Sequence, residues 1–332
     1  ESFARRLAVD FADYLPFDTA GDMRAVLRAL QPSALVFSKL DVWPVLVREA
    51  STRGVPLGMV SATLAAGSSR RSGPAARLLR DAYARLDRVG AIAAADADRL
   101  VELGVRPDAV RVTGDTRYDQ VWARAAAADR TGPLLAPLAS GRPTLVAGST
   151  WPADERTLLP AWERVRAAVP GARLVIAPHE PTAGHLAPIE RWATSAGLRL
   201  ARLSAPDAPA ADVVLVDRVG VLGELYALAD AAYVGGGFHA AGLHSVLEPA
   251  AFGAPVLFGP RFANSRDAEL LVEAGGGATA PDARALGDVL LRWLTDDDAR
   301  REAGHHARAL VEGGLGAAER SWDLVAELLS FR

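Results

Sequence analysis

The sequence predicts an α/β protein in which two units, each built on a parallel sheet, are joined by a linker. The first observation is an alternation of short apolar runs, such as 34–37 and 57–60, with polar loops, helical stretches and glycine turns. The second is the stretch 122–140, which is rich in Ala and contains two prolines, as linkers often are. The third is that the alternation begins again at 144–147. Repeated strand–helix–strand units favour parallel sheets.

The first half is expected to contain four strands. A helix capped by Asp18 or Thr19 should run to about residue 30, because apolar side chains recur at helical spacing there and Pro32 follows. The later elements are expected in the order strand 34–37, helix 43–51, strand 57–60, a helix ending near residue 86, strand 89–93, helix 96–103 and strand 110–113.

The second half repeats the pattern with a strand at 144–147, a helix beginning at the acidic pair 154–155, strands at 173–176 and 212–216, a helix at 222–228, a strand at 231–234, a helix beginning at 244 and a strand at 255–258. We therefore expect a first Rossmann-like unit over 1–124, a linker over 125–140, a second unit over 141–316, and a C-terminal helix over 317–332 that packs back on the first unit.

Composition excludes several classes of function. The chain has 332 residues, of which 50% are hydrophobic, and a net charge of −3, so no overall basic charge favours nucleic acid. It contains no cysteine, which excludes disulfides, thiolate metal sites and a cysteine nucleophile. No apolar run reaches the roughly 18–20 residues that cross a bilayer. The acidic triplet 296–298 is interpreted as a helix cap and not as a metal site.

Polar clusters directly follow several of the predicted strands. They are 38–41, 148–150, 178–180 and 235–239. Ligands of open α/β sheets bind beyond the carboxyl ends of the strands, so we expect the clusters of each unit to converge on one edge of its sheet. Two such edges opposed across a cleft would hold a substrate between them.

The stretch 233–267 carries the strongest local signal. A strand ends in Gly235, Gly236 and Gly237, and a loop then leads to His244, Ser245 and Glu248. A glycine-rich turn that feeds a helix N-terminus presents backbone N–H groups and the positive end of the helix dipole to an anion. The alternative is a tight structural turn in which the acid at the helix start interacts with the dipole.

Several segments together carry a family resemblance. They are L-V-F-S-K-L-D-V-W-P (35–44), R-G-V-P-L-G-M-V-S-A-T-L (53–64), S-R-R (69–71), D-A-D-R-L-V-E-L-G-V (96–105), V-T-G-D-T-R-Y-D (112–119), G-S-T (148–150) and G-L-H-S-V-L-E-P-A-A-F-G-A-P-V-L-F-G-P (242–260). The chain resembles the transferases of 3-deoxy-D-manno-octulosonic acid (Kdo), which move Kdo from CMP-Kdo to lipid A precursors. The resemblance implies a GT-B fold, with two Rossmann-like domains facing across a cleft.

The resemblance also implies a place and a set of partners. The first unit would be the acceptor side and the second the nucleotide-sugar donor side. The partners would be CMP-Kdo, a phosphorylated glycolipid acceptor and a membrane surface, at the cytoplasmic face of the bacterial inner membrane, without a cofactor or a metal. The catalytic glutamate and the membrane anchor of the family precede the point that corresponds to Glu1. We therefore expect an incomplete first domain and a chain that is soluble as given. The chain would then be either a fragment without transfer activity or a relative whose donor or acceptor differs.

Three positions depart from the family pattern. Lys39, Leu40 and Asp41 stand where an acidic-Thr-Glu sequence is usual, Pro178 replaces the Arg before His179, and the usual His-Asn pair is His244-Ser245. Asp41 is the one candidate general base in the chain. Its alternative is an acid ahead of the helix that begins at Trp43.

The site residues implied by the resemblance fall into two groups. The donor-binding group is Gly148, Ser149, Thr150, His179, Gly235, Gly236, Gly237, His244, Ser245, Glu248, Asn264 and Arg266, and the acceptor-binding group is Lys39, Asp41, Arg70 and Arg71. Each has a structural alternative, such as helix capping for 148–150 or a solvated helix start for 70–71. Trp151 and Trp192 are assigned to core or interface packing.

Two other functions stay open at this point. The segment 112–119 also resembles sugar-nucleotide epimerases of a related two-domain fold. The expected loss of the catalytic glutamate is in turn compatible with a non-catalytic protein that binds a nucleotide or a partner.

Overall fold

The structure is a computed structural model that describes residues 9–330 and divides the chain into two compact units. One unit comprises residues 1–116 and 315–332, and the other comprises residues 117–314. Residues 1–8 and 331–332, which begin and end the predicted outer ranges, lie outside the described part. Residues 125–140 fall in the second unit, where Leu135 and Leu138 are buried in its core.

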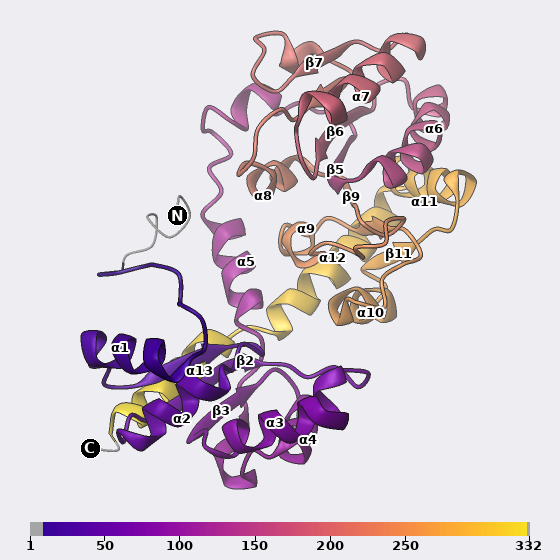
Figure 1. The fold of residues 1–332 in the computed structure, drawn as a ribbon. Helices are drawn as coiled ribbons and strands as arrows, with labels where there is room; N and C mark the ends of the chain where they lie inside the picture. Colours follow the sequence, from indigo (N-terminus) through magenta and orange to yellow (C-terminus); the bar gives the residue numbers. More distant parts are fainter. Residues whose placement is uncertain (1–8, 331–332) are drawn as a thin grey trace. The chain divides into compact units, whose positions relative to one another are not determined.

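The first unit is built on a parallel sheet. Its described strands lie in the order β1 (Leu35–Ser38), β2 (Leu57–Ala62), β3 (Arg88–Ala91) and β4 (Val110–Val112). Its helices are α1 (Ala20–Leu30), α2 (Pro44–Thr52), α3 (Gly73–Ala84), α4 (Ala94–Leu103) and α13 (Ala317–Leu329) (Figure 1). Thr19 caps α1 through its side chain, which accepts a hydrogen bond from the backbone N–H of Asp22.

The C-terminal helix α13 packs against β2 and β3 of this sheet. Glycine at position 58 makes the contact possible, because a Cβ there would lie 2.4 Å from Cδ1 of Leu328. The carboxylate of Glu327 also accepts hydrogen bonds from Arg88, at 2.9 Å, and from Arg111. The last helix of the chain is therefore part of the first unit.

The second unit is built on a larger parallel sheet. Its described strands lie in the order β11 (Gly277–Thr279), β10 (Val256–Phe258), β9 (Ala231–Val234), β5 (Thr144–Thr150), β6 (Arg173–Pro178), β8 (Val213–Leu215) and β7 (Leu200–Arg202). Strands after β5 are added on the β6 side, and from β9 onward they are added on the other side. The strand order therefore reverses between β5 and β9, and ligands of doubly wound sheets bind at such a switch point.

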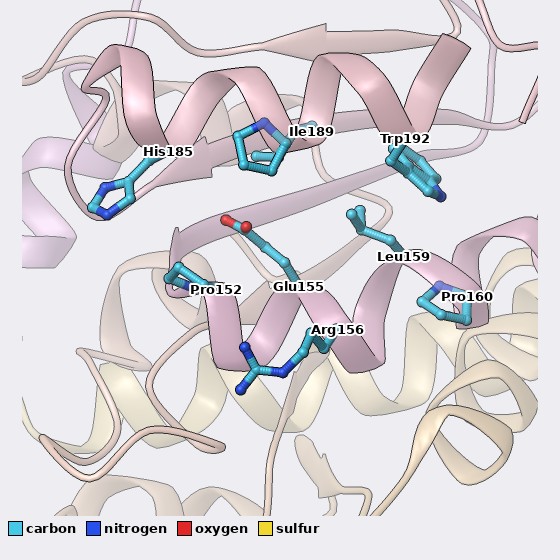
Figure 2. A pocket seen from close by; sticks show the side chains of 9 residues that line it. Pro152, Glu155, Arg156, Leu159, Pro160, His185, Ile189 and Trp192 are labelled. Atoms are coloured by element: carbon cyan, nitrogen blue, oxygen red, sulfur yellow. The ribbon is translucent and has the colours of Figure 1, made fainter. Parts of the chain in front are cut away.

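Helices of varied length surround this sheet. They are α5 (Thr116–Ala126, which begins at the boundary of the units), α6 (Pro152–Ala168), α7 (Ala183–Ser195), α8 (Leu222–Leu225), α9 (Leu247–Ala251), α10 (Arg266–Glu273), α11 (Ala283–Thr295) and α12 (Asp297–Gly313). Helices α6 and α7 run beside each other and leave a groove between them (Figure 2). Asp296 caps α12 by accepting hydrogen bonds from the N–H groups of Asp298 and Ala299, which confirms the helix cap expected at the acidic triplet.

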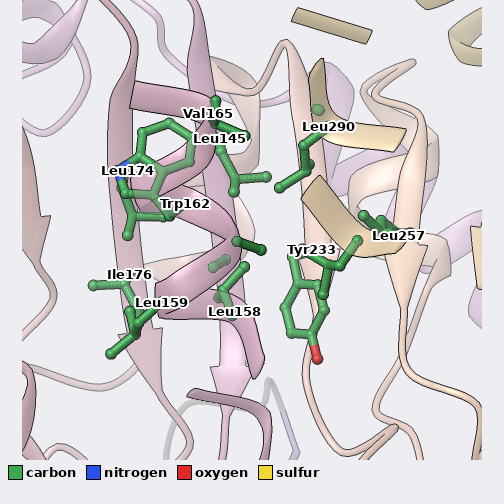
Figure 3. Close-up of a cluster of buried hydrophobic side chains, with 14 of the residues drawn as sticks. Leu145, Leu158, Leu159, Trp162, Val165, Leu174, Ile176, Tyr233, Leu257 and Leu290 are labelled. Atoms are coloured by element: carbon green, nitrogen blue, oxygen red, sulfur yellow. The ribbon is translucent and has the colours of Figure 1, made fainter. Parts of the chain in front are cut away.

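The main core of the second unit lies between its sheet and helices α6 and α11. Trp162 of α6 is fully buried beside Leu174, and Tyr233 of β9 lies near Leu257 of the next strand (Figure 3). A fully buried tryptophan typically stabilises a core by about 3–5 kcal/mol relative to alanine. The strands that carry the switch point are thus held by a continuous apolar layer on this face.

The sequence misplaced one helix of the second unit. A helix was expected from His244, but α9 begins at Leu247 and spans only five residues. Gly253, with a φ of +76°, follows its last turn. A helix this short carries only a small dipole, so the anion site expected at its N-terminus lacks the main source of its field.

Candidate functional site

The candidate site lies where β5, β6 and β9 end. These strands are neighbours in the order β9–β5–β6, and all run parallel. Trp151 follows β5, His179 follows β6, and His239 and His244 lie in the loop after β9. Parallel strands bring their carboxyl ends to one edge, so four residues far apart in the sequence meet there.

The rings of these residues form one cluster, which we call the ring cluster (Trp151, His179, His239 and His244). The ring centroid of Trp151 lies 4.3 Å from that of His239 and 4.5 Å from that of His179. The rings of His179 and His244 are 4.6 Å apart. The contacts confirm that the loops after these strands converge. Trp151, which was assigned to core or interface packing, is half-buried and packs against the rings of His179, His239 and His244.

Hydrogen bonds fix the tautomers of two of the histidines. Nε1–H of Trp151 donates to Nε2 of His244 at 3.0 Å, so the proton of neutral His244 is on Nδ1. The backbone N–H of Ala241 donates to Nδ1 of His239 at 3.1 Å, so neutral His239 carries its proton on Nε2. Burial, together with the neighbouring His179, lowers the pKa of His244. The neutral form of His244 is therefore favoured in the folded protein.

Asp154 holds the glycine-rich loop against β5. Its buried carboxylate accepts hydrogen bonds from the N–H groups of Gly236 (2.8 Å), Phe238 (3.1 Å) and Trp151 (2.9 Å). The hydroxyl of Tyr233 donates to it as well, at 3.1 Å. The sequence had indicated only an acidic helix start here. A buried carboxylate with four donors instead ties the loop after β9 to the beginning of α6.

The three glycines of this loop are in contact with their own chain. A Cβ at Gly235 would lie 2.1 Å from the carbonyl oxygen of Ser149, and one at Gly237 would lie 2.4 Å from the N atom of Gly259. At Gly236, φ is +96° and a Cβ would lie 2.1 Å from the carbonyl oxygen of Gly242. Their lack of side chains is thus required by packing. The N–H of Gly236 is occupied by Asp154, and that of Gly235 donates to Gly148.

The end of β5 has an unusual backbone. Ser149 has a φ of +53°, and the pairing of β5 with β6 shifts register between Gly148 and Thr150. A positive φ is uncommon for serine and marks a strained position. A Cβ at Gly148 would lie 2.0 Å from the hydroxyl of Tyr226. The hydroxyl of Thr150 donates to Glu155 of α6 at 2.9 Å and is therefore occupied within the fold.

Glu248 lies in the first turn of α9 and is only partly exposed. Burial raises its pKa, and the guanidinium of Arg124, 3.6 Å away, partly opposes this effect. Gly223 lies against both side chains, since a Cβ there would be 3.2 Å from Cδ of Arg124 and 3.8 Å from a carboxylate oxygen of Glu248. Burial and Glu248 together raise the pKa of Tyr226. The sequence did not single out Arg124.

The remaining predicted donor residues differ in what they contact. The amide of Asn264 accepts from the N–H of Leu243 at 3.1 Å and donates to its carbonyl at 3.2 Å, which fixes the loop after Gly242. Arg266 is exposed at the beginning of α10, and Ser245 is exposed between His244 and α9. Asn264 therefore positions the loop, whereas Ser245 and Arg266 are accessible to a ligand.

The four predicted acceptor residues lie in the first unit. Lys39 and Asp41 are exposed after β1, and Lys39 has a φ of +59°. Nη1 of Arg70 donates to the carbonyl of Leu40, which links this loop to the segment at 69–71. Arg71 instead forms an exposed ion pair with Glu102, at 2.7 Å. Within this unit, three of the four residues therefore belong to one connected region.

None of the helices in the described part of the chain is long and apolar enough to span a bilayer.

Comparison with protein families and curated proteins gave one consistent result. Residues 1–120 match the family model of 3-deoxy-D-manno-octulosonic-acid transferase (kdotransferase). The 3-deoxy-D-manno-octulosonic acid transferase of Bordetella pertussis is 34% identical over 95% of this chain and 74% of its own length. The enzymes of the same name from Chlamydophila psittaci and Haemophilus influenzae are 31% and 25% identical, over 93% and 98% of this chain and 71% and 78% of their lengths.

Two solved structures with a similar fold are UDP-N-acetylglucosamine 2-epimerases. The UDP-GlcNAc 2-epimerase of Neisseria meningitidis, bound to UDP-GlcNAc, aligns with a TM-score of 0.66 over 93% of this chain and 80% of that one, at 14% identity. Another UDP-N-acetylglucosamine 2-epimerase aligns with a TM-score of 0.60 over 89% of this chain and 75% of that one, at 17% identity. These identities support a shared fold only. The predicted fold class, two α/β units of the GT-B type, is confirmed.

Proposed function

Because the chain belongs to the 3-deoxy-D-manno-octulosonic acid transferase family, we propose that it transfers Kdo from CMP-Kdo to a hydroxyl group of a lipid A precursor during lipopolysaccharide synthesis. It is a glycosyltransferase by family. The observation that carries the proposal is the ring cluster at the switch point of the second unit, which offers several imidazole groups where a nucleotide-sugar would bind.

The chemistry of the donor fits this cluster. CMP-Kdo has two anionic groups, a phosphodiester and the carboxylate of the sugar. The neutral tautomer of His239 carries a proton on Nε2 that can be donated to such a group. His179 is exposed, and its ring stacks on the same indole as that of His239. Trp151, which contacts both rings, positions them. Ser245 and Arg266 are accessible for further contacts with the same anions.

Transfer then proceeds at the anomeric carbon of Kdo. The acceptor oxygen forms a bond to that carbon, and the bond from the carbon to the phosphate oxygen breaks. CMP leaves with the bonding electron pair, and the hydroxyl proton passes to a base. Imidazole donors aimed at the phosphate stabilise the charge that develops on the departing CMP. The glycine-loop N–H groups of Gly235 and Gly236 already serve the fold, so this work falls to the side chains.

Glu248 is proposed to contact the ribose of CMP. Its carboxyl group is partly buried and next to Arg124. In either protonation state it can accept a hydrogen bond from a hydroxyl group, and the neutral form can also donate one. Gly148, Thr150, Gly237, His244 and Asn264 are proposed to act indirectly, by shaping the loops that hold the direct contacts.

In the first unit we propose that Lys39 and Arg70 contact the phosphate groups of the acceptor. Lysine and arginine are the usual partners of phosphate. Arg71 has a carboxylate partner, Glu102, and would need to exchange it for the acceptor. Exposed Phe11, Tyr14 and Phe17, at 67%, 80% and 86%, support a membrane-facing role for this unit, at the cytoplasmic face of the inner membrane.

The proposal is tested by ligand protection against thermal unfolding. CMP-Kdo should raise the melting temperature of the chain, since a ligand at 100 times its Kd stabilises by about 2.7 kcal/mol. His239→Ala and Glu248→Ala should each reduce the shift, and His305→Ala, at an exposed position of α12, should leave it unchanged. If neither CMP nor CMP-Kdo raises the melting temperature of the unaltered chain, donor binding is refuted.

Transfer itself is measured with CMP-Kdo and a lipid A precursor. Asp41→Asn should reduce transfer without changing the CMP-Kdo melting shift, because Asp41 is the proposed base in the first unit. If the Asp41→Asn variant transfers Kdo at the same rate as the unaltered chain, Asp41 is not the base. Binding of CMP-Kdo with no transfer at all would support the non-catalytic alternative.

The epimerase alternative has its own signature. The neighbours with that activity share only 14% and 17% identity with this chain, so they carry no argument for it. Incubation with UDP-N-acetylglucosamine, followed by analysis for its 2-epimer, separates the two functions. Formation of the epimer would overturn the transferase proposal.

A further inference from the structure

The groove between α6 and α7 has no part in the proposed transfer. It encloses about 380 Å³. Each helix contributes residues that lie one turn apart, which are Pro152, Glu155 and Leu159 on α6, and His185, Ile189 and Trp192 on α7 (Figure 2). Spacings of three and four residues place side chains on one face of a helix. The groove is therefore a regular feature of two packed helix faces.

A buried carboxyl group projects into this groove. Glu155 is only 6% exposed, and Figure 2 shows its carboxyl end directed across the groove toward α7. Among the described residues its hydrogen-bond partner is the hydroxyl of Thr150, which donates to Oε1 at 2.9 Å. Oε2 is left facing the groove. Burial raises the pKa of this carboxyl group, and the hydrogen bond from Thr150 together with the nearby His185 and Arg156 opposes that effect only in part.

Other hydrogen-bond acceptors face the same space. Nδ1 of His185 lies 2.8 Å from the carbonyl of Glu180, which can only accept, so neutral His185 exposes an unprotonated Nε2. Pro160 lies inside α6 and Pro188 inside α7, and both line the groove. A proline inside a helix cannot donate to the carbonyl four residues earlier. The usual helical donor is therefore missing at two further carbonyl groups.

The rest of the wall is apolar. Leu159 and Ile189 are buried, and the half-buried indole of Trp192 closes one end, where its Nε1–H donates to Glu163 at 2.6 Å. Arg156 is exposed at the rim, and its long side chain can keep the guanidinium in water. The groove thus combines an apolar wall and an aromatic ring with the carboxyl group of Glu155 and the imidazole of His185.

We propose that this groove binds a small primary amine carried on an apolar or aromatic body. The ammonium group would lie against Oε2 of Glu155, and the body would lie between Leu159, Ile189 and Trp192. An ammonium group has three donors and no acceptor, which matches a site lined with acceptors.

Other classes of ligand fit less well. An anion would place its charge beside a buried carboxyl group, and Arg156 alone is too exposed to compensate for that repulsion. A neutral apolar ligand would displace water from Glu155 and leave its second oxygen without a partner, which is costly for a buried polar group. The organic cation is the class that both fills the groove and satisfies the carboxylate.

The test uses the full chain and a matched pair of probes, phenethylamine and its neutral analogue 2-phenylethanol, with binding measured by calorimetry at pH 7.5. The unaltered chain should bind the amine at least tenfold more tightly than the alcohol. Glu155→Gln should abolish this preference, since it keeps the shape and removes the charge. Trp192→Leu should weaken both probes by about fivefold, because it removes the aromatic wall.

The control is Glu269→Gln, which removes an exposed carboxylate on α10 and should leave both affinities unchanged. Far-ultraviolet circular dichroism establishes that each variant is folded before its affinity is compared. Equal affinities of the two probes for the unaltered chain would overturn the proposal. A preference for the amine that persists in Glu155→Gln would overturn it too, as would no binding of either probe up to about 10 mM.

Discussion

Replacement of Asp154 by Asn should destabilise the second unit strongly. The two carboxylate oxygens of Asp154 are fully buried, and each accepts two hydrogen bonds, from Trp151 and Gly236 at Oδ2 and from Tyr233 and Phe238 at Oδ1. An amide keeps one oxygen and replaces the other by a donor. Two of the four hydrogen bonds to the carboxylate are then lost. In place of Oδ2 the NH₂ group faces the N–H groups of Trp151 and Gly236, and in place of Oδ1 it faces the N–H group of Phe238 and the hydroxyl of Tyr233.

The magnitude follows from the number of hydrogen bonds lost. A hydrogen bond to a charged group contributes about 1.5–3 kcal/mol. Two of them give a loss of about 3–5 kcal/mol, after allowance for the smaller cost of burying a neutral side chain. Unfolding in urea, followed by tryptophan fluorescence, measures this loss. Five of the seven tryptophans lie within residues 117–314, so the signal reports mainly on the second unit.

The matched control is Asp288→Asn. Asp288 is about half exposed and pairs with Arg164 at 2.8 Å, and an exposed ion pair contributes roughly 0–1 kcal/mol. If Asp154→Asn unfolds within about 1 kcal/mol of the unaltered chain, the inference that this carboxylate holds the glycine-rich loop is wrong. If both variants lose the same stability, the effect is not specific to the buried carboxylate.

Three further predictions concern the same unit. His244 has a lowered pKa, so the unfolded chain binds more protons than the folded one below about pH 6.5, and stability should fall as the pH drops through that value. His244→Phe should therefore make the melting temperature depend less on pH between about pH 7.5 and 5.5. Gly235→Ala should cost about 2–3 kcal/mol in urea unfolding, because its Cβ would meet the backbone of Ser149 at 2.1 Å, and Gly171→Ala, where nothing lies within 4 Å, should cost far less. Glu248 has a raised pKa, so its contribution to stability is present at acidic pH and is lost as the pH rises through that pKa. Glu248→Gln should therefore raise the melting temperature at pH 8 more than at pH 4.5. A shift of equal size at both pH values would contradict the raised pKa of Glu248.

Much of the fold could be predicted from the sequence because it depends on local patterns. The short apolar runs at 57–60 and 173–176 are strands β2 and β6 to within two residues. Apolar runs bounded by turn residues have few other ways to bury their side chains. The short helix α9 was misjudged because residues 244–246 are not helical and Gly253 follows its end, and neither feature is evident from helical periodicity.

Part of the candidate site could be predicted from the sequence for the same reason. His179 was selected because it follows a strand, and His244 because it stands at the end of the glycine-rich loop in the segment that carries the resemblance. The parallel sheet brings the centroids of their rings within 4.6 Å of each other. Trp151 was assigned to packing, and the structure shows that its packing partners are histidine rings from loops distant in the sequence. Asp154 looked like an ordinary acid in the first turn of a helix. Its four donors come from residues up to 84 positions away, and no local pattern contains that information.

By itself, the sequence determined the two α/β units, the polar clusters at the strand ends and the membership of the transferase family, because these depend on periodicity and on identity of residues. Only the tertiary structure decided which groups are free to act. It showed that Gly235 and Gly236 donate within the fold and that Asp154 holds their loop. The physical reason is that a hydrogen-bond donor serves one acceptor at a time, and the competing acceptors are contributed by distant parts of the chain.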